Sequence, residues 1–230
     1  MKITWLGQAG LLFESEGKTL VIDPYLSDSV VKINPRNYRR VPADESFFDL
    51  RPDLLLCTHD HLDHLDPETL CHYFTPDSHM TVFAPESCFR TLLGFPGRNN
   101  VVLFRPGTQW TEGPFRLTAT FAEHSDYCAV GAVIEAEGKA YYVTGDTLYS
   151  ERVFASLPAV DLYAVFLPVN GVGNNMNFAD GARFAARTGA KYAVPLHVGL
   201  FDQLRGDQFP APNKVVPEFY RQIRFPDDEE

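Results

Sequence analysis

Short runs of apolar and β-branched residues, separated by Gly, Pro, Asn and Asp, follow one another along most of the chain. Runs of this length with polar breaks between them are typical of buried or half-buried strands. The runs that we expect to form strands are residues 3–6, 11–14, 19–22, 53–57, 81–84, 101–104, 115–121, 129–135, 140–144, 162–167 and 191–195.

Helix signals lie between these runs. Asp66 precedes Pro67 and Glu68, which is the pattern of a helix N-cap, a proline at the first helical position and an acidic first turn. Asn177 is placed to cap another helix, which Gly189 would end. The helices that we expect are residues 67–74, 85–93, 146–156, 178–188 and 214–223.

The remaining long segment, residues 26–52, is polar and rich in Pro, Asn, Arg and Asp, so we expect a loop. Long loops in compact domains are uncommon and often functional. The chain shows no internal repeat, low-complexity tract or Gly/Ser linker. We therefore expect one α+β domain over residues 1–230, with sheet packed on sheet and helices outside.

Charge and cysteine content indicate which partners and which cellular compartment to expect. The formal net charge is −10, and an acidic surface does not attract polyanions, so no nucleic-acid partner is expected. The four cysteines form no C-x-x-C pair and are expected to be reduced thiols. No apolar run approaches membrane-spanning length, and the N-terminal run is expected to be a strand rather than a signal peptide. We expect a cytoplasmic protein with no membrane partner; the oligomeric state stays open, a homo-oligomer included.

The most informative motif is His59-x-His61-x-Asp63-His64, at the end of the apolar run 53–57. A loop that follows a buried strand presents its side chains from a rigid base. Imidazole and carboxylate groups are the natural ligands for zinc, iron or manganese. The alternative is a polar loop of solvated residues, which explains one histidine more readily than the whole motif.

Three more possible ligands, His124, Asp146 and His197, each follow an expected strand. Taken singly, each is most simply a polar residue at a strand end. Taken together with the histidine motif, they predict a metal site at one rim of a sandwich.

In its ordered motifs the chain resembles the metallo-β-lactamase superfamily, and within it the L-ascorbate-6-phosphate lactonase-like (UlaG-like) branch. The segments that carry the resemblance are Trp5-Leu6-Gly7-Gln8-Ala9-Gly10, Val21-Ile22-Asp23-Pro24, Thr58 to His64, His124, Thr144-Gly145-Asp146-Thr147, Leu167-Pro168-Val169-Asn170-Gly171 and Pro195-Leu196-His197. The resemblance implies a four-layer αβ/βα sandwich.

The resemblance also implies two divalent metal ions, zinc or manganese, and their ligands. One ion would be held by His59, His61 and His124. The other would be held by Asp63, His64 and His197, and Asp146 would bridge the two. We take Asp63, His64 and Asp146 as the catalytic residues, because a hydroxide bridging two cations attacks a carbonyl or phosphorus centre. Oxygen-reducing relatives carry a carboxylate where this chain has His61, so the imidazole favours hydrolysis.

Other residues are candidates for supporting roles. Asp23 and Thr58 are placed to hydrogen-bond ligand imidazoles, although Asp23 could instead only end a strand before Pro24. Arg36 and Arg39 could clamp a phosphate or carboxylate, against a solvated loop as the alternative. Asn170 could bind substrate, or cap and turn the chain.

The function that we predict is hydrolysis of a small ester or lactone, with a sugar-phosphate lactone as one candidate. The small-molecule substrate would then be phosphorylated. The same two-metal chemistry also serves a phosphodiesterase acting on a cyclic nucleotide or nucleic-acid end. A metal-dependent sensor without catalytic activity is the alternative of another class.

Overall fold

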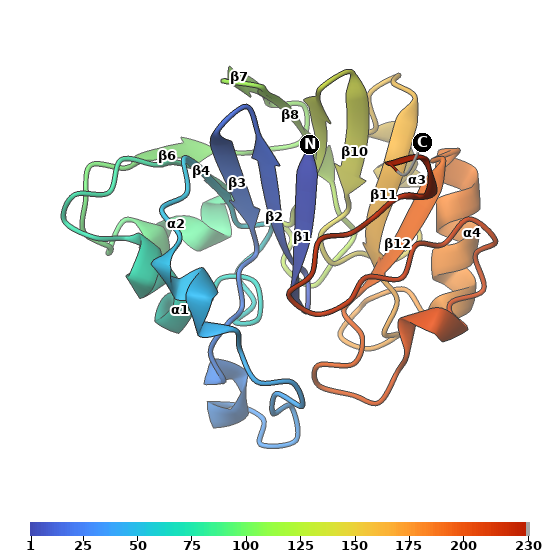
Figure 1. Cartoon of the computed structure of the whole chain (residues 1–230), viewed down its shortest axis with the longest axis horizontal. Coiled ribbons are helices and arrows are strands. Elements are labelled where there is room, and N and C mark those ends of the chain that lie inside the picture. Colours follow the sequence, from blue (N-terminus) through green and yellow to red (C-terminus); the bar gives the residue numbers. More distant parts are fainter. Residues whose placement is uncertain (229–230) are drawn as a thin grey trace.

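Two six-stranded sheets face each other in the computed structural model, which describes residues 1–228 (Figure 1). The last two residues of the predicted domain lie outside the described residues. The first sheet consists of β1 (Lys2–Gly7), β2 (Gly10–Ser15), β3 (Lys18–Ile22), β4 (Leu54–Leu56), β5 (Thr81–Ala84) and β6 (Asn100–Leu103). These strands follow one another in chain order: β1 to β3 pair antiparallel, and β3 to β6 pair parallel.

The second sheet mirrors this arrangement. It consists of β7 (Gln109–Glu112), β8 (Phe115–Phe121), β9 (Val130–Ala136), β10 (Lys139–Val143), β11 (Leu162–Pro168) and β12 (Tyr192–Leu196). From β7 to β10 the pairs are antiparallel, and β10, β11 and β12 are parallel. Sequence analysis missed β7, whose residues are only exposed or half-buried and give no apolar signal.

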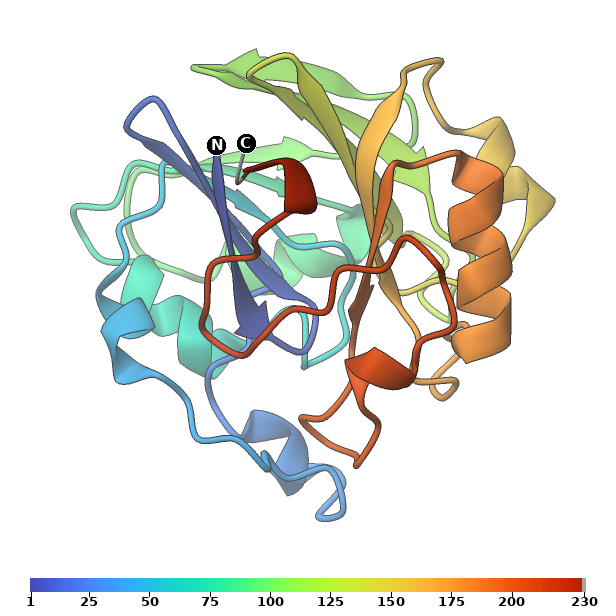
Figure 2. The ribbon, with the colours of Figure 1, turned by 45° about the vertical axis from the view of Figure 1, so that its right-hand side comes forward.

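Alternation along the strands explains the layers. Leu54 and Leu56 join the core between the sheets, whereas Leu55 points to the opposite face. That face packs on α1 (Pro67–Tyr73) and α2 (Phe89–Leu92), and the outer face of the second sheet packs on α3 (Glu151–Ala155) and α4 (Phe178–Thr188). Figures 1 and 2 show the helices on the two outer sides of the sheet pair. The predicted four-layer αβ/βα sandwich is confirmed.

The caps read from the sequence fix two of the helices. Asp66 accepts hydrogen bonds from the backbone N–H groups of Glu68 and Thr69 at the start of α1. Asn177 caps α4, and Gly189 ends it in the left-handed conformation. Two other helices are shorter than predicted, because α3 begins only after the N-cap Ser150 and residues 86–88 form a 3-10 turn before α2.

The helix predicted over residues 214–223 is wrong. Pro217 would interrupt it, because proline removes a helical donor and clashes with the preceding turn. The segment instead covers the open edges of both sheets, where Tyr220 and Ile223 donate backbone hydrogen bonds to β1 and Val215 donates to β12. Covering edge strands protects them from pairing with other chains. The backbone N–H groups of this segment therefore bond to the sheet edges and not within a helix.

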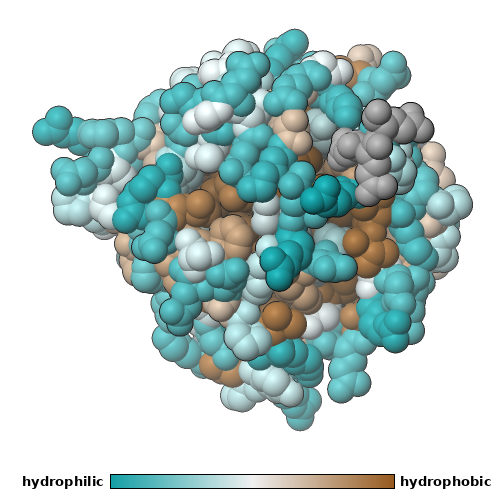
Figure 3. All heavy atoms as spheres, viewed as in Figure 1, coloured by the Kyte–Doolittle hydropathy of each residue, from teal (hydrophilic) through white to brown (hydrophobic). Residues whose placement is uncertain are grey.

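The predicted loop over residues 26–52 contains two 3-10 turns, Ser29–Lys32 and Glu45–Asp49, and no strand. In Figure 1 the blue part of this loop lies below the sheets, beside the orange-red loop that follows β12. Figure 3 shows a largely hydrophilic surface in the same view, with apolar side chains visible between the polar ones. Among the described residues, no helix combines the length and apolar character needed to cross a bilayer.

Gly145, beside the predicted ligand Asp146, lies close to Val130 at the start of β9 and to Thr58 after β4. It has a φ of +61°, and a Cβ there would lie 2.6 Å from the carbonyl oxygen of Val130 and 3.1 Å from Thr58 Cβ. Gly138 has a similar φ of +73° but open space around it. Alanine substitutions at the two glycines therefore distinguish the cost of backbone strain from the cost of steric overlap.

We expect Gly138→Ala to lower the free energy of unfolding by about 1–2 kcal/mol, the cost of a left-handed alanine. Gly145→Ala adds overpacking against backbone and should cost another ~1–3 kcal/mol. Urea unfolding of the two variants measures the difference. Equal losses would show that the contact between Gly145 and Val130 is not tight.

Candidate metal centre

Polar residues follow the ends of strands that run in one direction. Within the first sheet β1, β3 and β4 are mutually parallel, and within the second β8, β10, β11 and β12 are mutually parallel. Their C-terminal ends therefore share one edge of each sheet. The residues that lie within three positions of these ends are Gln8, Asp23, His59, His124, Asp146, Asn170 and His197.

Backbone hydrogen bonds join the two edges. His197 N–H donates to the carbonyl of Gln8 at 3.0 Å, and Val130 N–H donates to the carbonyl of Thr58 at 3.0 Å. Gln8, Asp23 and His197 hold positive φ angles of 49°, 44° and 64°. Such backbone conformations are costly for residues with side chains and cluster at functional sites, so the fold fixes where these three side chains point.

The structure brings all seven predicted ligands together. Three groups have possible ligand atoms within 4.8 Å of one another; these are His59, His61 and His124, then Asp63, His64 and His197, and then His59, His64 and Asp146. The first two groups match the two sets implied by the resemblance. The third places Asp146 between them, as a bridging residue requires.

The first set consists of imidazoles alone. His124 Nε2 lies 3.1 Å from His61 Nδ1, a separation that suits an N–H···N hydrogen bond in one pair of tautomers and two ligands of a shared cation in the other. Burial, followed by the charge of His64, holds the pKa of His59 well below its usual range. Burial also lowers the pKa of His124. Both rings therefore stay neutral, which is the form that binds a metal.

The second set mixes imidazoles and carboxylates. His197 Nε2 lies 3.2 Å from Asp63 Oδ2 and 3.2 Å from Asp146 Oδ2, and His64 Nε2 lies 3.3 Å from Asp146 Oδ2. Burial lowers the pKa of His197, but Asp146 and Asp63 outweigh it and raise the pKa to about 9. A metal ligand must be deprotonated, so cation binding and proton release are coupled at this set.

Unpartnered buried atoms test whether cations fit here. His59 Nε2 and Asp146 Oδ1 are buried and have no hydrogen-bond partner, and the buried His64 Nε2 has only the 3.3 Å contact with Asp146 Oδ2. Leaving such atoms unpaired is costly, and all three belong to one group of possible ligands. Nitrogen and carboxylate donors suit zinc, and manganese or iron are compatible with them. The residues present therefore fit a divalent metal centre.

The far side of the ligand rings shows which nitrogen would face a metal. Asp23 Oδ2 lies 2.8 Å from His64 Nδ1 and accepts the Thr58 hydroxyl at 2.6 Å. Because that hydroxyl is used as a donor, Thr58 Oγ1 is left to accept from His59 Nδ1 at 3.0 Å. The Nε2 atoms of both rings then face the site. Burial lowers the pKa of His64, but Asp146, Asp23 and Asp63 outweigh it and raise that pKa well above its usual range, so a proton must leave His64 when a metal binds. Asp23 and Thr58 thus make the contacts that sequence analysis predicted.

Replacing Asp23 by Asn should weaken metal binding by about 10–100-fold, the usual loss when a residue that orients ligand histidines is changed. Competition with a chromophoric chelator measures this. Asp66→Asn is the matched control, because Asp66 is equally buried and also binds a threonine hydroxyl, but caps α1. The control should largely keep the helix cap, because Asn caps a helix about as well as Asp, and metal affinity should be retained. Equal metal affinity in both variants would contradict the role of Asp23.

Gln8 and Asn175 were not among the predicted site residues. Gln8 Nε2 donates to Asp63 Oδ2 at 2.8 Å and lies 3.0 Å from His197 Nδ1. Asn175 Nδ2 donates to Asp146 Oδ2 at 2.8 Å. Gln8 stands directly after a strand, as His197 does, and that shared position is the signal that could have identified it. Asn170, which was predicted, lies 2.9 Å from His197 Nδ1 through its own Nδ2.

The predicted arginine clamp is not built in this structure. The guanidinium of Arg39 donates to the carbonyl of Tyr25 and the hydroxyl of Tyr220, and it stacks over the Tyr25 ring. Arg36 is exposed. Neither side chain lines the cavity above the ligands. Arg39 instead fastens the 26–52 loop to the C-terminal segment.

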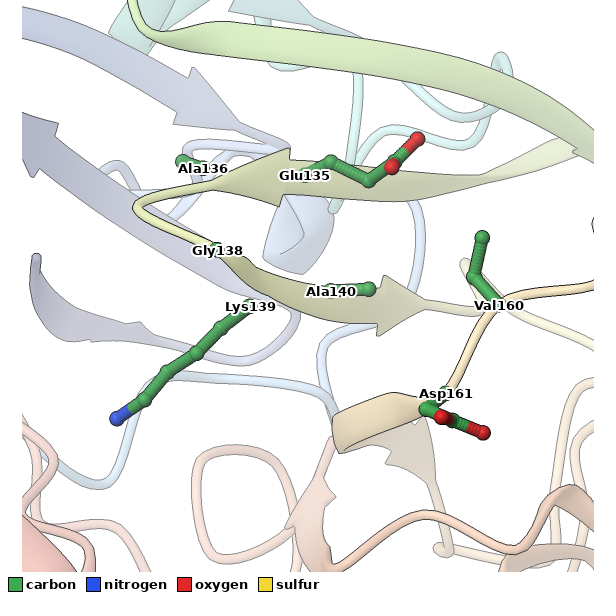
Figure 4. Close-up of a pocket in the computed structure, with 7 residues that line it drawn as sticks. All are labelled: Glu135, Ala136, Gly138, Lys139, Ala140, Val160 and Asp161. Atoms are coloured by element: carbon green, nitrogen blue, oxygen red, sulfur yellow. The ribbon is translucent and has the colours of Figure 1, made fainter.

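That cavity has a volume of about 500 Å³ and contains His61, Asp63, Asp146 and His197 in its wall. A different hollow lies at the hairpin between β9 and β10, lined by Glu135, Lys139 and Asp161 among others (Figure 4). It sits at the opposite end of β10 from Asp146, roughly 16 Å away for a five-residue strand. Only the first cavity opens onto the ligand cluster.

Comparisons with known proteins agree with this geometry. A sequence model of the beta-lactamase superfamily domain matches residues 18–198. A UPF0173 metal-dependent hydrolase of Thermoplasma acidophilum is 32% identical over 219 residues, which cover 90% of this chain and 87% of that protein.

Solved structures give the same fold. An isothiocyanate hydrolase from Delia radicum gut bacteria has a TM-score of 0.76 at 20% identity, covering 98% of this chain and 99% of its own. Igni18, a metallo hydrolase of Ignicoccus hospitalis, has a TM-score of 0.73 at 22% identity, covering 96% and 97%. By its sequence the chain belongs to the beta-lactamase superfamily and, within it, to the UPF0173 metal-dependent hydrolase family.

Proposed function

We propose that this protein is a hydrolase that holds two divalent cations and cleaves a small ester or lactone. The observation that carries the proposal is the set of buried atoms without hydrogen-bond partners on His59, His64 and Asp146, which converge from the loop after β4 and the segment after β10. One cation would be held by His59, His61 and His124. The other would be held by Asp63, His64 and His197, with one oxygen of Asp146 toward each.

Two bound cations supply Lewis acidity and lower the pKa of a shared water molecule toward neutrality. The chain provides the rest. Asp63 is the carboxylate more open to the cavity, with 17% of its side chain exposed against 5% for Asp146. Gln8 holds the Asp63 oxygen that also contacts His197. Asp63 is therefore placed to orient the attacking water.

The name of the isothiocyanate hydrolase shows that this fold also supports hydrolysis of an electrophile that is not an ester. The relatives named as metal-dependent hydrolases support the broader class. We keep the ester or lactone as the proposal, and a lactonase-like relationship with it, because the motifs at Gln8, Asn170 and His197 resemble that branch.

The test is elemental analysis of protein purified without added metal, followed by two activity screens. Two equivalents of zinc or manganese per chain and turnover of a lactone or aryl ester are expected. Turnover of bis-p-nitrophenyl phosphate alone would identify a phosphodiesterase instead. Metal-loaded protein that turns over no ester, lactone or phosphodiester would overturn the catalytic proposal and favour the sensor.

A further inference from the structure

The wall of the active-site cavity offers apolar and amide groups to a substrate. Val30, Val172 and Phe201 form its apolar part. The carboxamides of Asn34, Asn37, Asn170 and Asn175 also line it. Such groups bind neutral polar atoms and hydrocarbon, and they supply no full positive charge.

Cationic side chains are missing from this wall. Among the described residues that line the cavity, none is Lys or Arg, and Asp202 adds a carboxylate. The Arg39 guanidinium donates to the backbone carbonyl of Tyr25, and the Arg40 guanidinium donates to that of Phe201. A phosphate group remote from the reacting carbonyl would therefore find no bidentate partner. The net charge of −10 also repels dianions over a longer range.

Several exposed apolar side chains are close in sequence to residues of the site. Within residues 1–228, seven large apolar side chains are exposed, and five of them lie within three residues of a lining residue or a predicted ligand. These five are Ile33, Tyr38, Tyr127, Leu148 and Val172. Val172 is 65% exposed and lines the cavity as well.

From these observations we infer that the substrate is an uncharged ester or lactone with an apolar substituent, and that a phosphorylated lactone is a poorer substrate. The inference rests on the proposed function. The reacting carbonyl would lie at the ligand cluster. The apolar substituent would lie against Val30, Val172 and Phe201 and extend toward the rim.

Three γ-butyrolactones that differ only in the substituent on the γ-carbon test the inference: pentyl, hydroxymethyl and phosphomethyl. We expect kcat/KM to be roughly tenfold or more higher for the pentyl lactone than for the hydroxymethyl lactone, mainly through KM, and lowest for the phosphomethyl lactone. If the phosphomethyl lactone is the best substrate, the inference is wrong and the hydrolase stands. If none of the three is hydrolysed, the proposed function fails and the inference fails with it.

A pair of variants places the apolar subsite. Val172→Arg should raise KM for the pentyl lactone roughly tenfold and lower KM for the phosphomethyl lactone, with kcat for the pentyl lactone little changed. Leu93→Arg is the matched control, because Leu93 is 67% exposed but does not line the cavity. Its kinetics should equal those of the unmodified protein. The same KM values in both variants would overturn the assignment of Val172 to the substrate site.

Discussion

Replacing Asp146 by Asn is expected to reduce kcat/KM by on the order of 10³-fold or more, because metal-ion catalysis contributes several kcal/mol of transition-state stabilisation. Asp146 Oδ2 faces His64 and His197, whereas Oδ1 is buried without a partner. The two carboxylate oxygens of Asp146 therefore face different sides of the site. An amide of the same size keeps the shape and removes both the charge and one acceptor.

Metal content should fall together with activity. If the protein holds two metal ions as proposed, we expect the Asp146→Asn protein to retain about one equivalent, because the bridging carboxylate would be shared by both ions. Asp161→Asn is the control, since Asp161 is exposed at the far hollow, and both metal content and activity should be unchanged there. A fully active Asp146→Asn protein with two metals would remove Asp146 from the mechanism.

The positions of the possible ligands could be predicted from sequence because each depends on a local rule. A side chain just after a buried strand is carried by the sheet, and parallel strands end at the same edge. His59, His124, Asp146 and His197 all follow this rule, so their convergence required only that the two sheets face each other. The continuous apolar run Leu54-Leu55-Leu56 fits a sheet covered on both faces, and the structure places Leu54 and Leu56 between the sheets and Leu55 under the helices.

What the sequence did not reveal depends on contacts between distant segments. Arg39 looks like a free cation in the sequence, but Tyr220, 181 residues later, accepts its hydrogen bond. Residues 214–223 have a plausible helical pattern, yet the open edges of β1 and β12 provide backbone partners for them. Gln8 has no motif character by itself and gains its role from Asp63 and His197.

Asp146 shows how one residue can satisfy two local patterns. Asp146-Thr147 resembles a helix start, and the sequence predicted a helix from that point. In the structure Ser150 caps α3 instead, and Thr147 accepts the backbone N–H of Glu123. This contact links the segment after β10 to the one after β8, which carries His124. The residues that were predicted to start a helix, Asp146 and Thr147, instead join the two segments that carry Asp146 and His124.

Removing the cations is expected to lower the stability of the folded protein, because the ligand cluster is costly to keep without them. Asp63 and Asp146 place carboxylate oxygens on the same nitrogen of His197, and buried atoms of three ligands lack partners. A cation that binds only the folded protein stabilises it by about 4 kcal/mol when its free concentration is 1,000 times its Kd. Two cations would act together, because Asp146 serves both.

Chelation should therefore lower Tm by about 15 °C or more, since 1 kcal/mol shifts Tm by about 2–4 °C in a chain of this size. Thermal unfolding followed by near-UV circular dichroism at buffered free zinc or manganese measures the shift, and Tm should rise with the logarithm of free metal. Asp146→Asn should flatten that rise, which separates loss of the bound ions from any direct action of the chelator. A Tm that does not respond to chelation would mean that the seven side chains are stable without metal, and the two-cation centre would then have no support from folding.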